Sequence, residues 1–211
     1  MTDRSGACAS LERWGPHLFS LGAVLELVFA LNNGLAFLLD GFSFVDWLYP
    51  TVLLGRAAVL LGIAGLSVRV TDRSPRIGKW SRIVLAVAFV FTLGLLSLSL
   101  LEIAGVTIMW NSLIFALLGL GTVALTVITF ALFGVLILRS GAFSTATGGL
   151  LLAAAVTVVG VFVGLNVLPS RLVGGVGEGI LFVLFLVTSL RLRTEFMTTD
   201  RPEPVSNTVA E

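Results

Sequence analysis

The sequence predicts an all-α integral membrane protein, built as a bundle of six transmembrane helices with both termini in the cytoplasm. Hydrophobic residues make up 57% of the 211-residue chain and charged residues only 12%, whereas soluble domains carry about 25% charged residues. The mean hydropathy is +1.06. Six apolar runs follow one another along the chain, and each is long enough to cross a bilayer as a helix.

These runs form one predicted transmembrane domain over residues 17–193. They lie at about 17–40, 47–70, 82–104, 112–138, 145–168 and 173–191. Lipid offers no partner for backbone polar groups, and the runs lack the strict alternation of barrel strands, so we expect helices. The first run exceeds the apolar core of about 7–15 residues in a signal peptide, and no small-residue cleavage site follows it, so we interpret it as a retained helix.

Polar segments flank the predicted domain. Residues 1–16 form a short polar tail, and residues 194–211 form a second, proline-containing tail that we expect to be disordered. Both tails are predicted to be cytoplasmic. Cys8 is the one cysteine of the chain, which excludes a disulfide within it.

The basic residues predict the orientation in the cell membrane. An even number of spans places both termini on one side, where eleven of the thirteen Lys and Arg residues then lie, against Arg171 alone on the other side. By the positive-inside rule, the side with both termini is cytoplasmic. The densest group surrounds the loop between the second and third spans and is predicted to set the topology: Arg69, Arg73, Arg76, Lys79 and Arg82.

Two charged residues inside the spans are candidates for a site. Arg56 lies about 13 Å from the outer end of the second span, at about 1.5 Å per residue, and Glu26 lies within the first. An arginine in mid-span costs roughly 2.5–3.5 kcal/mol and usually faces a partner or a wet cavity. Three interpretations are open: an ion pair that fixes helix packing, a pair linked to a substrate or proton, or an Arg56 that extends to the outer headgroups.

Polar residues gather in the predicted outer half of the spans. Asn33 shares a small, polar helix face with Glu26, and Glu178 lies one turn or more inside the sixth span. This asymmetry predicts an outward polar pocket formed by Glu26, Asn33, Arg56 and Glu178. The alternative is that most outer polar residues only mark helix ends at the headgroups.

Glycines and threonines predict helix-packing surfaces. The stretch Gly174–Gly179 (GGVGEG) lacks the Lys-Ser/Thr of a phosphate-binding loop, and its Gly175 and Gly179 are spaced for close helix approach. Two further stripes of small residues favour packing between helices. They are Gly149, Ala153, Thr157, Gly160 and Gly164 in the fifth span, and Gly119, Thr122, Thr126 and Thr129 in the fourth.

Several chemistries are excluded by composition. His17 is the one histidine and no lysine lies within a span, so paired-histidine haem sites, histidine metal clusters and a retinal Schiff base have no residues to build them. No hydrolase or zinc-protease motif occurs. We therefore expect no metal, no cofactor and no nucleic-acid partner, and no residue set nominates an enzymatic reaction.

The stretch LLGRAAVLLGIAGLSVRVTDRSPRIGKW, residues 53–80, resembles the second span and basic loop of small multi-span archaeal membrane proteins with no assigned activity. The preference for arginine over lysine is typical of GC-rich genomes of that kind. The resemblance implies a six-helix membrane protein and no activity. The size and span count also look like the substrate-binding subunits of energy-coupling-factor vitamin transporters, although their AxxxA pattern is missing from the first span here.

Two functional hypotheses follow. The first is a protein that binds or transports a small solute through the outward pocket, with Arg56 binding an anionic group or holding the charge state of a carboxylate. The second is a structural or accessory membrane subunit in which Glu26 and Arg56 form an internal packing ion pair. Its partners would be the lipid bilayer and a second copy or another membrane subunit.

Overall fold

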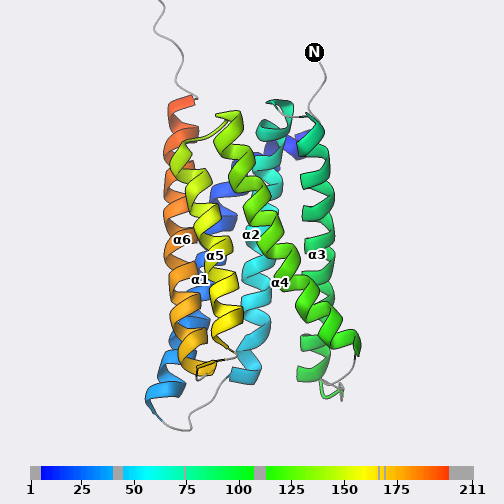
Figure 1. Cartoon of the computed structure of the whole chain (residues 1–211), viewed down its shortest axis with the longest axis vertical. Coiled ribbons are helices and arrows are strands. Elements are labelled where there is room, and N and C mark those ends of the chain that lie inside the picture. Colours follow the sequence, from blue (N-terminus) through cyan, green and yellow to red (C-terminus); the bar gives the residue numbers. More distant parts are fainter. Residues whose placement is uncertain are drawn as a thin grey trace, which may run out of the picture.

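The computed structural model describes residues 6–39, 45–73, 75–106, 113–165, 167–168 and 170–199. These residues form an all-helical bundle (Figure 1). Its six helices are α1 (Gly6–Leu38), α2 (Val45–Arg73), α3 (Pro75–Ile103), α4 (Leu113–Ser140), α5 (Thr145–Gly164) and α6 (Ser170–Thr199).

Consecutive helices pack against one another, and α6 returns to pack against α1, which closes the bundle into a ring. Helix α4 runs obliquely across one face, as Figure 1 shows, and also touches α2. The start of α1 and the end of α6 lie at the same end of the bundle, which we call the terminal end. The end where α1 finishes and α6 begins is called the opposite end.

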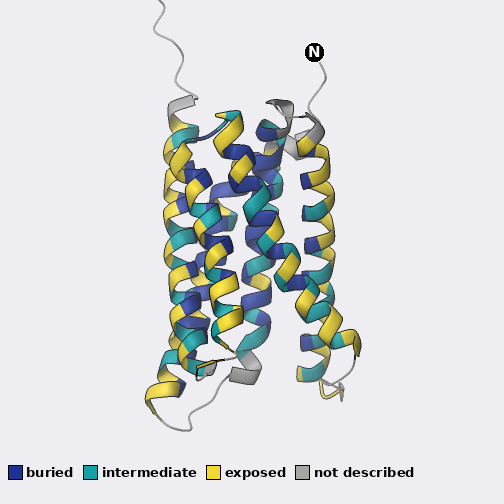
Figure 2. Cartoon of the chain, in the orientation of Figure 1, coloured by how far each residue is buried: buried dark blue, intermediate teal, exposed yellow. Residues whose placement is uncertain are grey.

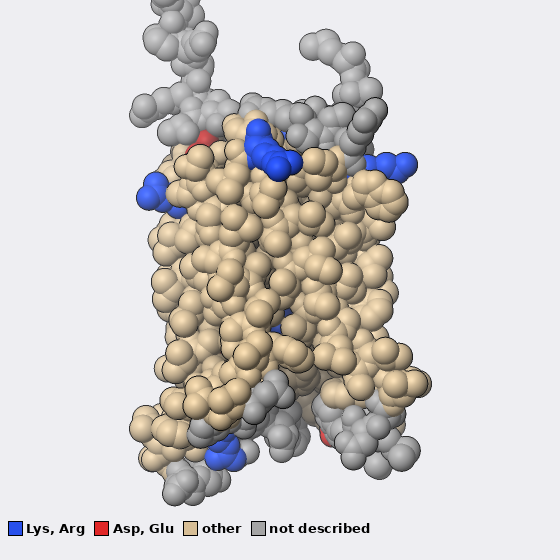
Figure 3. All heavy atoms as spheres, viewed as in Figure 1, with Lys and Arg blue, Asp and Glu red and all other residues tan. Residues whose placement is uncertain are grey.

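The outer surface of the bundle is apolar along its length. All six helices are long and apolar enough to cross a membrane. Large outward side chains are widely exposed, such as Leu113 at 74% and Val156 at 71%. Figures 2 and 3 show this exposed surface and a nearly uncharged belt between charged ends. In water so large an apolar surface would be a liability, whereas lipid favours it. The prediction of six membrane-length helices is confirmed.

The helices extend beyond the apolar runs at both ends. Helix α1 includes residues 6–16, predicted as a tail, and α6 continues through residues 194–199, predicted as disordered. Hydropathy marks the apolar part of a helix, and a helix continues into charged turns when they find partners. At the end of α6, Glu195 accepts hydrogen bonds from the Ser144 amide and the Thr147 hydroxyl, which caps the start of α5. Residues 1–5 and 200–211 lie outside the described part.

The predicted basic loop is also mostly helical. Only residue 74 separates α2 from α3, and it lies outside the described residues. Arg69 is not a free interfacial charge: it forms an ion pair with Glu12, and its guanidinium carbon lies 4.5 Å from the ring centroid of Phe196. Lys79 and Arg82 are exposed, as a topology signal requires. The side chains of Arg73 and Arg76 lie outside the described part.

Aromatic side chains fill the bundle interior toward the terminal end. The rings of Phe19 and Phe130 each pack edge-on against Phe185, with centroid distances of 6.3 Å and 5.7 Å. All three are at most 1% exposed. This group joins α1, α4 and α6 and closes the interior without polar atoms.

Glycines allow α1 and α2 to approach backbone to backbone. A Cβ added to Gly65 would lie 2.5 Å from the carbonyl oxygen of Leu11, and one added to Gly62 would lie 3.3 Å from that of Gly15. The predicted stripe on α5 is used only in part: Gly149, Ala153 and Gly160 face outward, whereas a Cβ added to Gly164 would lie 3.0 Å from the side chain of Val173 on α6. Small residues also pack α4 against α5, but through Gly134 and Gly148, where each added Cβ would lie 2.9 Å from the carbonyl oxygen of the other glycine.

We predict that Gly65→Ala lowers the free energy of unfolding by roughly 1–3 kcal/mol, because the added methyl meets backbone atoms that cannot move aside. Gly160→Ala is the matched control, since nothing lies within 4 Å of its added Cβ, and it should be neutral or slightly stabilising. Reversible unfolding of the detergent-solubilised protein measures both. Equal stability of the two variants would contradict the packing described for α1 and α2.

Candidate functional site

Three charged side chains from three helices meet midway along the bundle. Arg56 on α2 donates a hydrogen bond from Nη2 to Oε1 of Glu178 on α6 at 3.0 Å. Its Nε lies 3.7 Å from Oε1 of Glu26 on α1. The side chains of Arg56, Glu26 and Glu178 are 12%, 0% and 6% exposed. We call these three residues the charge cluster. The predicted Glu26–Arg56 pair is present, but Glu178 is the closer partner of Arg56.

A glycine contact between α1 and α2 brings Glu26 to Arg56. Gly22 precedes Glu26 by about one helical turn, and Gly55 directly precedes Arg56. A Cβ on Gly55 would lie 3.3 Å from the carbonyl oxygen of Gly22, so the two backbones nearly touch at this level. Since residues four apart lie on one helix face, the carboxylate of Glu26 then reaches the guanidinium.

A second glycine contact positions Glu178. A Cβ on Gly175 would lie 3.3 Å from the backbone nitrogen of Gly34, and one on Gly174 would lie 3.0 Å from the amide nitrogen of Asn33. These contacts draw the first turns of α6 onto α1, one turn before Glu178. The predicted Gly175–Gly179 motif is used only in part, because an added Cβ on Gly179 would meet nothing.

Charge and hydrogen bonding are unbalanced in the charge cluster. Two carboxylates face one guanidinium, so with all three groups ionised the cluster carries one excess negative charge. Both carboxylate oxygens of Glu26, the Oε2 atom of Glu178 and the Nε atom of Arg56 are buried without a hydrogen-bond partner among the described residues, so three acceptors and one donor are unpaired. Buried carboxylates are costly unless charge and donors compensate them. With all three groups ionised, the cluster therefore has more unpaired acceptors than donors and one positive charge too few.

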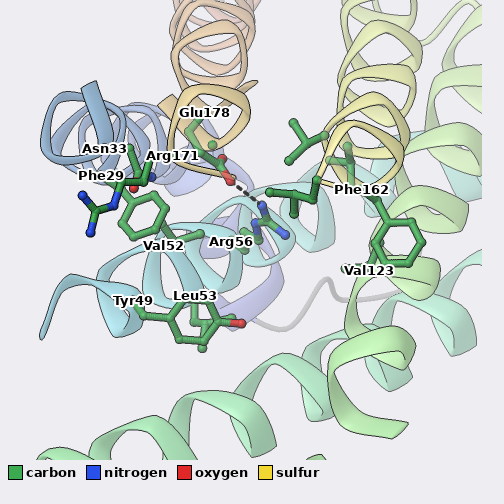
Figure 4. A pocket seen from close by; sticks show the side chains of 14 residues that line it. Phe29, Asn33, Tyr49, Val52, Leu53, Arg56, Val123, Phe162, Arg171 and Glu178 are labelled. Atoms are coloured by element: carbon green, nitrogen blue, oxygen red, sulfur yellow. Dashed lines mark hydrogen bonds and ion pairs between the residues drawn. The ribbon is translucent and has the colours of Figure 1, made fainter. Parts of the chain in front are cut away.

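A cavity of about 530 Å³ lies beside the charge cluster, between α1, α2, α4, α5 and α6. Most of its wall is apolar, including Phe29, Leu53, Val158 and Phe162. Its polar lining consists of Asn33, Tyr49, Arg56, Arg171 and Glu178. Figure 4 shows the Arg56–Glu178 pair at the wall, with Tyr49 and Phe162 on different sides of it.

A small charged area is visible on the otherwise apolar side of the bundle. In Figure 3 a small area of Lys or Arg atoms is visible through the tan surface about midway along this face. The side chain of Arg56 lines the cavity. Its partial exposure of 12% agrees with a guanidinium that borders open space.

Three of the four residues predicted to form the pocket line the cavity, and the fourth does not. Asn33, Arg56 and Glu178 line the cavity, whereas Glu26 is fully buried behind Arg56 and does not line it. Tyr49 was not predicted, although it is the one tyrosine of the chain and lies seven residues, or two turns, before Arg56.

Arg171 was predicted only as the basic residue of the opposite end. Its Nη1 donates a hydrogen bond to the carbonyl oxygen of Ala36 at 3.2 Å, which ties the first turn of α6 to the end of α1. In Figure 4 its guanidinium extends away from Arg56. Arg171 therefore contributes to the cavity wall without joining the charge cluster.

Three threonines add unpaired hydroxyls to the interior face of α4. Thr122, Thr126 and Thr129 are each at most 1% exposed, and their hydroxyl oxygens have no hydrogen-bond partner in the described part of the chain. Val123, next to Thr122, lines the cavity. Buried water would satisfy such hydroxyls where space allows. The three threonines of the predicted stripe are thus buried with unpaired hydroxyls, whereas its Gly119 is only half-buried and a Cβ added there would meet nothing within 4 Å.

The chain matches no protein-family model, and it shows no significant similarity to a curated protein or to a solved structure. The described residues contain no group of three or more His, Cys, Asp or Glu that could hold a metal ion. Functional inference therefore depends on the charge cluster and the cavity themselves.

We predict that Arg56→Met lowers the free energy of unfolding by roughly 3–5 kcal/mol, because it leaves two buried carboxylates without a counter-charge. The combined variant Glu26→Leu/Arg56→Met/Glu178→Leu removes all three charges and should recover most of that loss. Unfolding in detergent measures both. If Arg56→Met is as stable as the unmodified chain, Arg56 is not the counter-charge that stabilises the two buried carboxylates.

Proposed function

We propose that this chain is an integral membrane protein that binds a small, largely apolar molecule in the cavity beside Arg56 and takes part in moving it across the membrane. The observation that carries the proposal is a cavity of about 530 Å³ that meets a charged pair in the middle of an apolar bundle. Its volume lies in the range of small-molecule sites, and mostly apolar walls with a few placed polar groups are their usual composition.

Charge distribution supports an outward-facing cavity. The cavity residues come from the later part of α1, the early parts of α2 and α6, and the end of α5, so they lie toward the opposite end of the bundle. Lys79, Arg82, Arg139, Arg191 and Arg193 lie near the terminal end. By the positive-inside rule the terminal end is cytoplasmic, and the cavity then opens away from the cytoplasm.

The rest of the bundle supports a closed cytoplasmic side. Between the charge cluster and the terminal end, Phe19, Phe130 and Phe185 fill the interior. Nearer the terminal end, Ser189 donates a hydrogen bond to the carbonyl oxygen of Pro16 at 2.7 Å, and Arg69 pairs with Glu12. A transport cycle would have to open these contacts between α1, α2 and α6 while the outer cavity closes.

A structural or accessory subunit is the second candidate, and one observation favours it. The charge cluster joins α1, α2 and α6, and Arg56 is already paired with Glu178, so it could serve as internal packing alone. The two candidates differ in whether small molecules enter the cavity.

We predict that filling the cavity abolishes small-molecule binding. Val158 lines the cavity on α5, and Val156 on the same helix points outward with 71% exposure. Small molecules that raise the melting temperature of the purified protein should lose this effect in Val158→Trp and keep it in Val156→Trp, because only the first indole occupies the cavity. If the ligand-induced rise in melting temperature is kept in both variants, or is lost equally in both, the result would count against the proposed site.

A further inference from the structure

We propose that the cavity ligand is a small primary amine in its protonated form, with an apolar body in the cavity and its ammonium group on Glu178. This inference rests on the proposed function and specifies its ligand class. It reverses the expectation that Arg56 receives an anion, and it follows from the charges and hydrogen-bond acceptors that surround the guanidinium.

The charge balance of the site favours a cation. With both glutamates ionised, Glu26 and Glu178 outnumber Arg56 by one charge, and Arg171 is engaged with the Ala36 carbonyl away from the cluster. The other polar lining residues, Asn33 and Tyr49, are neutral amide and phenol groups. An anionic ligand would add a second uncompensated negative charge at the same place, whereas an ammonium group brings the cluster to neutrality.

The hydrogen-bond balance points the same way. Of the four carboxylate oxygens in the charge cluster, only Oε1 of Glu178 receives a hydrogen bond from the described residues. Glu178 is the glutamate of the charge cluster that lines the cavity, and its buried Oε2 atom has no hydrogen-bond donor among the described residues. A primary ammonium offers three N–H donors and one positive charge, while a carboxylate or phosphate ligand would bring only more acceptors.

The walls of the cavity suit the apolar part of such a ligand. Phe29, Tyr49 and Phe162 are spread around the cavity beside the Arg56–Glu178 pair in Figure 4, among valines and leucines. Aromatic faces attract cations as well as apolar groups, so they do not oppose the entry of an ammonium. Arg56 keeps its position by pairing with Glu26, which lies behind it and outside the cavity.

The test compares three ligands that share a phenyl-alkyl body and differ in the head group: 2-phenylethylammonium, 2-phenylethanol and 3-phenylpropionate. Dissociation constants are measured by calorimetry on the purified full chain in nanodiscs at neutral pH, with empty nanodiscs as the baseline. We expect the ammonium to bind about tenfold or more tightly than the alcohol, as a charge-assisted hydrogen bond would give, and the carboxylate to bind most weakly.

Two variants locate the preference. Glu178→Gln should remove the roughly tenfold advantage of the ammonium over the alcohol, so that the two ligands bind this variant with similar dissociation constants. Glu102→Gln removes a carboxylate near the end of α3, a helix that does not line the cavity, and should change nothing. Persistence of the ammonium preference in Glu178→Gln would overturn the assignment of that preference to this carboxylate.

The outcomes separate this inference from the proposed function. Tightest binding of the carboxylate, or equal binding of all three ligands, would overturn the amine assignment while the cavity remains a binding site. Binding of none of the three to folded protein would overturn both.

Discussion

The central physical constraint in this protein is the burial of the Arg56 guanidinium in the middle of an apolar bundle. Transferring an ion out of water costs several kcal/mol even after relaxation, and only close counter-charges recover that cost. Glu178 and Glu26 supply them from two other helices. The positions of α1, α2 and α6 are therefore coupled through one side chain, and any movement of one of these helices changes the compensation of the charge.

Glycines make this arrangement possible. The close approaches at Gly22, Gly55 and Gly175 bring the backbones of α1, α2 and α6 near enough for the carboxylates to reach Arg56. Elsewhere α4 and α5 stay farther from α2, and the cavity occupies the space between them. The bundle is thus tightly packed on the side that holds the charges and open on the side that faces the cavity. This combination suits a site whose charged groups are held in place while a ligand enters beside them.

Much of the fold could be predicted from the sequence, because length and apolarity specify membrane-crossing helices almost directly. Arg56, Glu178 and Asn33 could be proposed as one site for a similar reason, since polar residues in long apolar runs need partners. The Glu26–Arg56 ion pair was one of the predicted alternatives, but the position of Glu26 outside the cavity could not be predicted, because it depends on how closely two glycines let the helices approach. The apolar cavity wall, which includes Phe29 and Phe162, gave no signal, because apolar residues that line a cavity look the same in the sequence as apolar residues that face lipid.

The lengths of the helices were underestimated for a related reason. Glu12 and Arg69 look like interfacial charges in the sequence, and only the fold shows that they form an ion pair within the ends of α1 and α2.

The most direct test of this account is whether water and small polar reagents reach the cavity in the membrane-embedded protein. The chain has one cysteine, so Cys8→Ser provides a clean background for single-cysteine variants. Leu53 and Leu60 lie two turns apart on α2 and are 2% and 1% exposed, but only Leu53 lines the cavity. Thiols react as thiolates and need a polar environment. The account predicts that a cationic methanethiosulfonate reagent modifies Leu53→Cys much faster than Leu60→Cys. Equal, slow modification of both would mean that the cavity is closed and that the charge cluster only packs the helices.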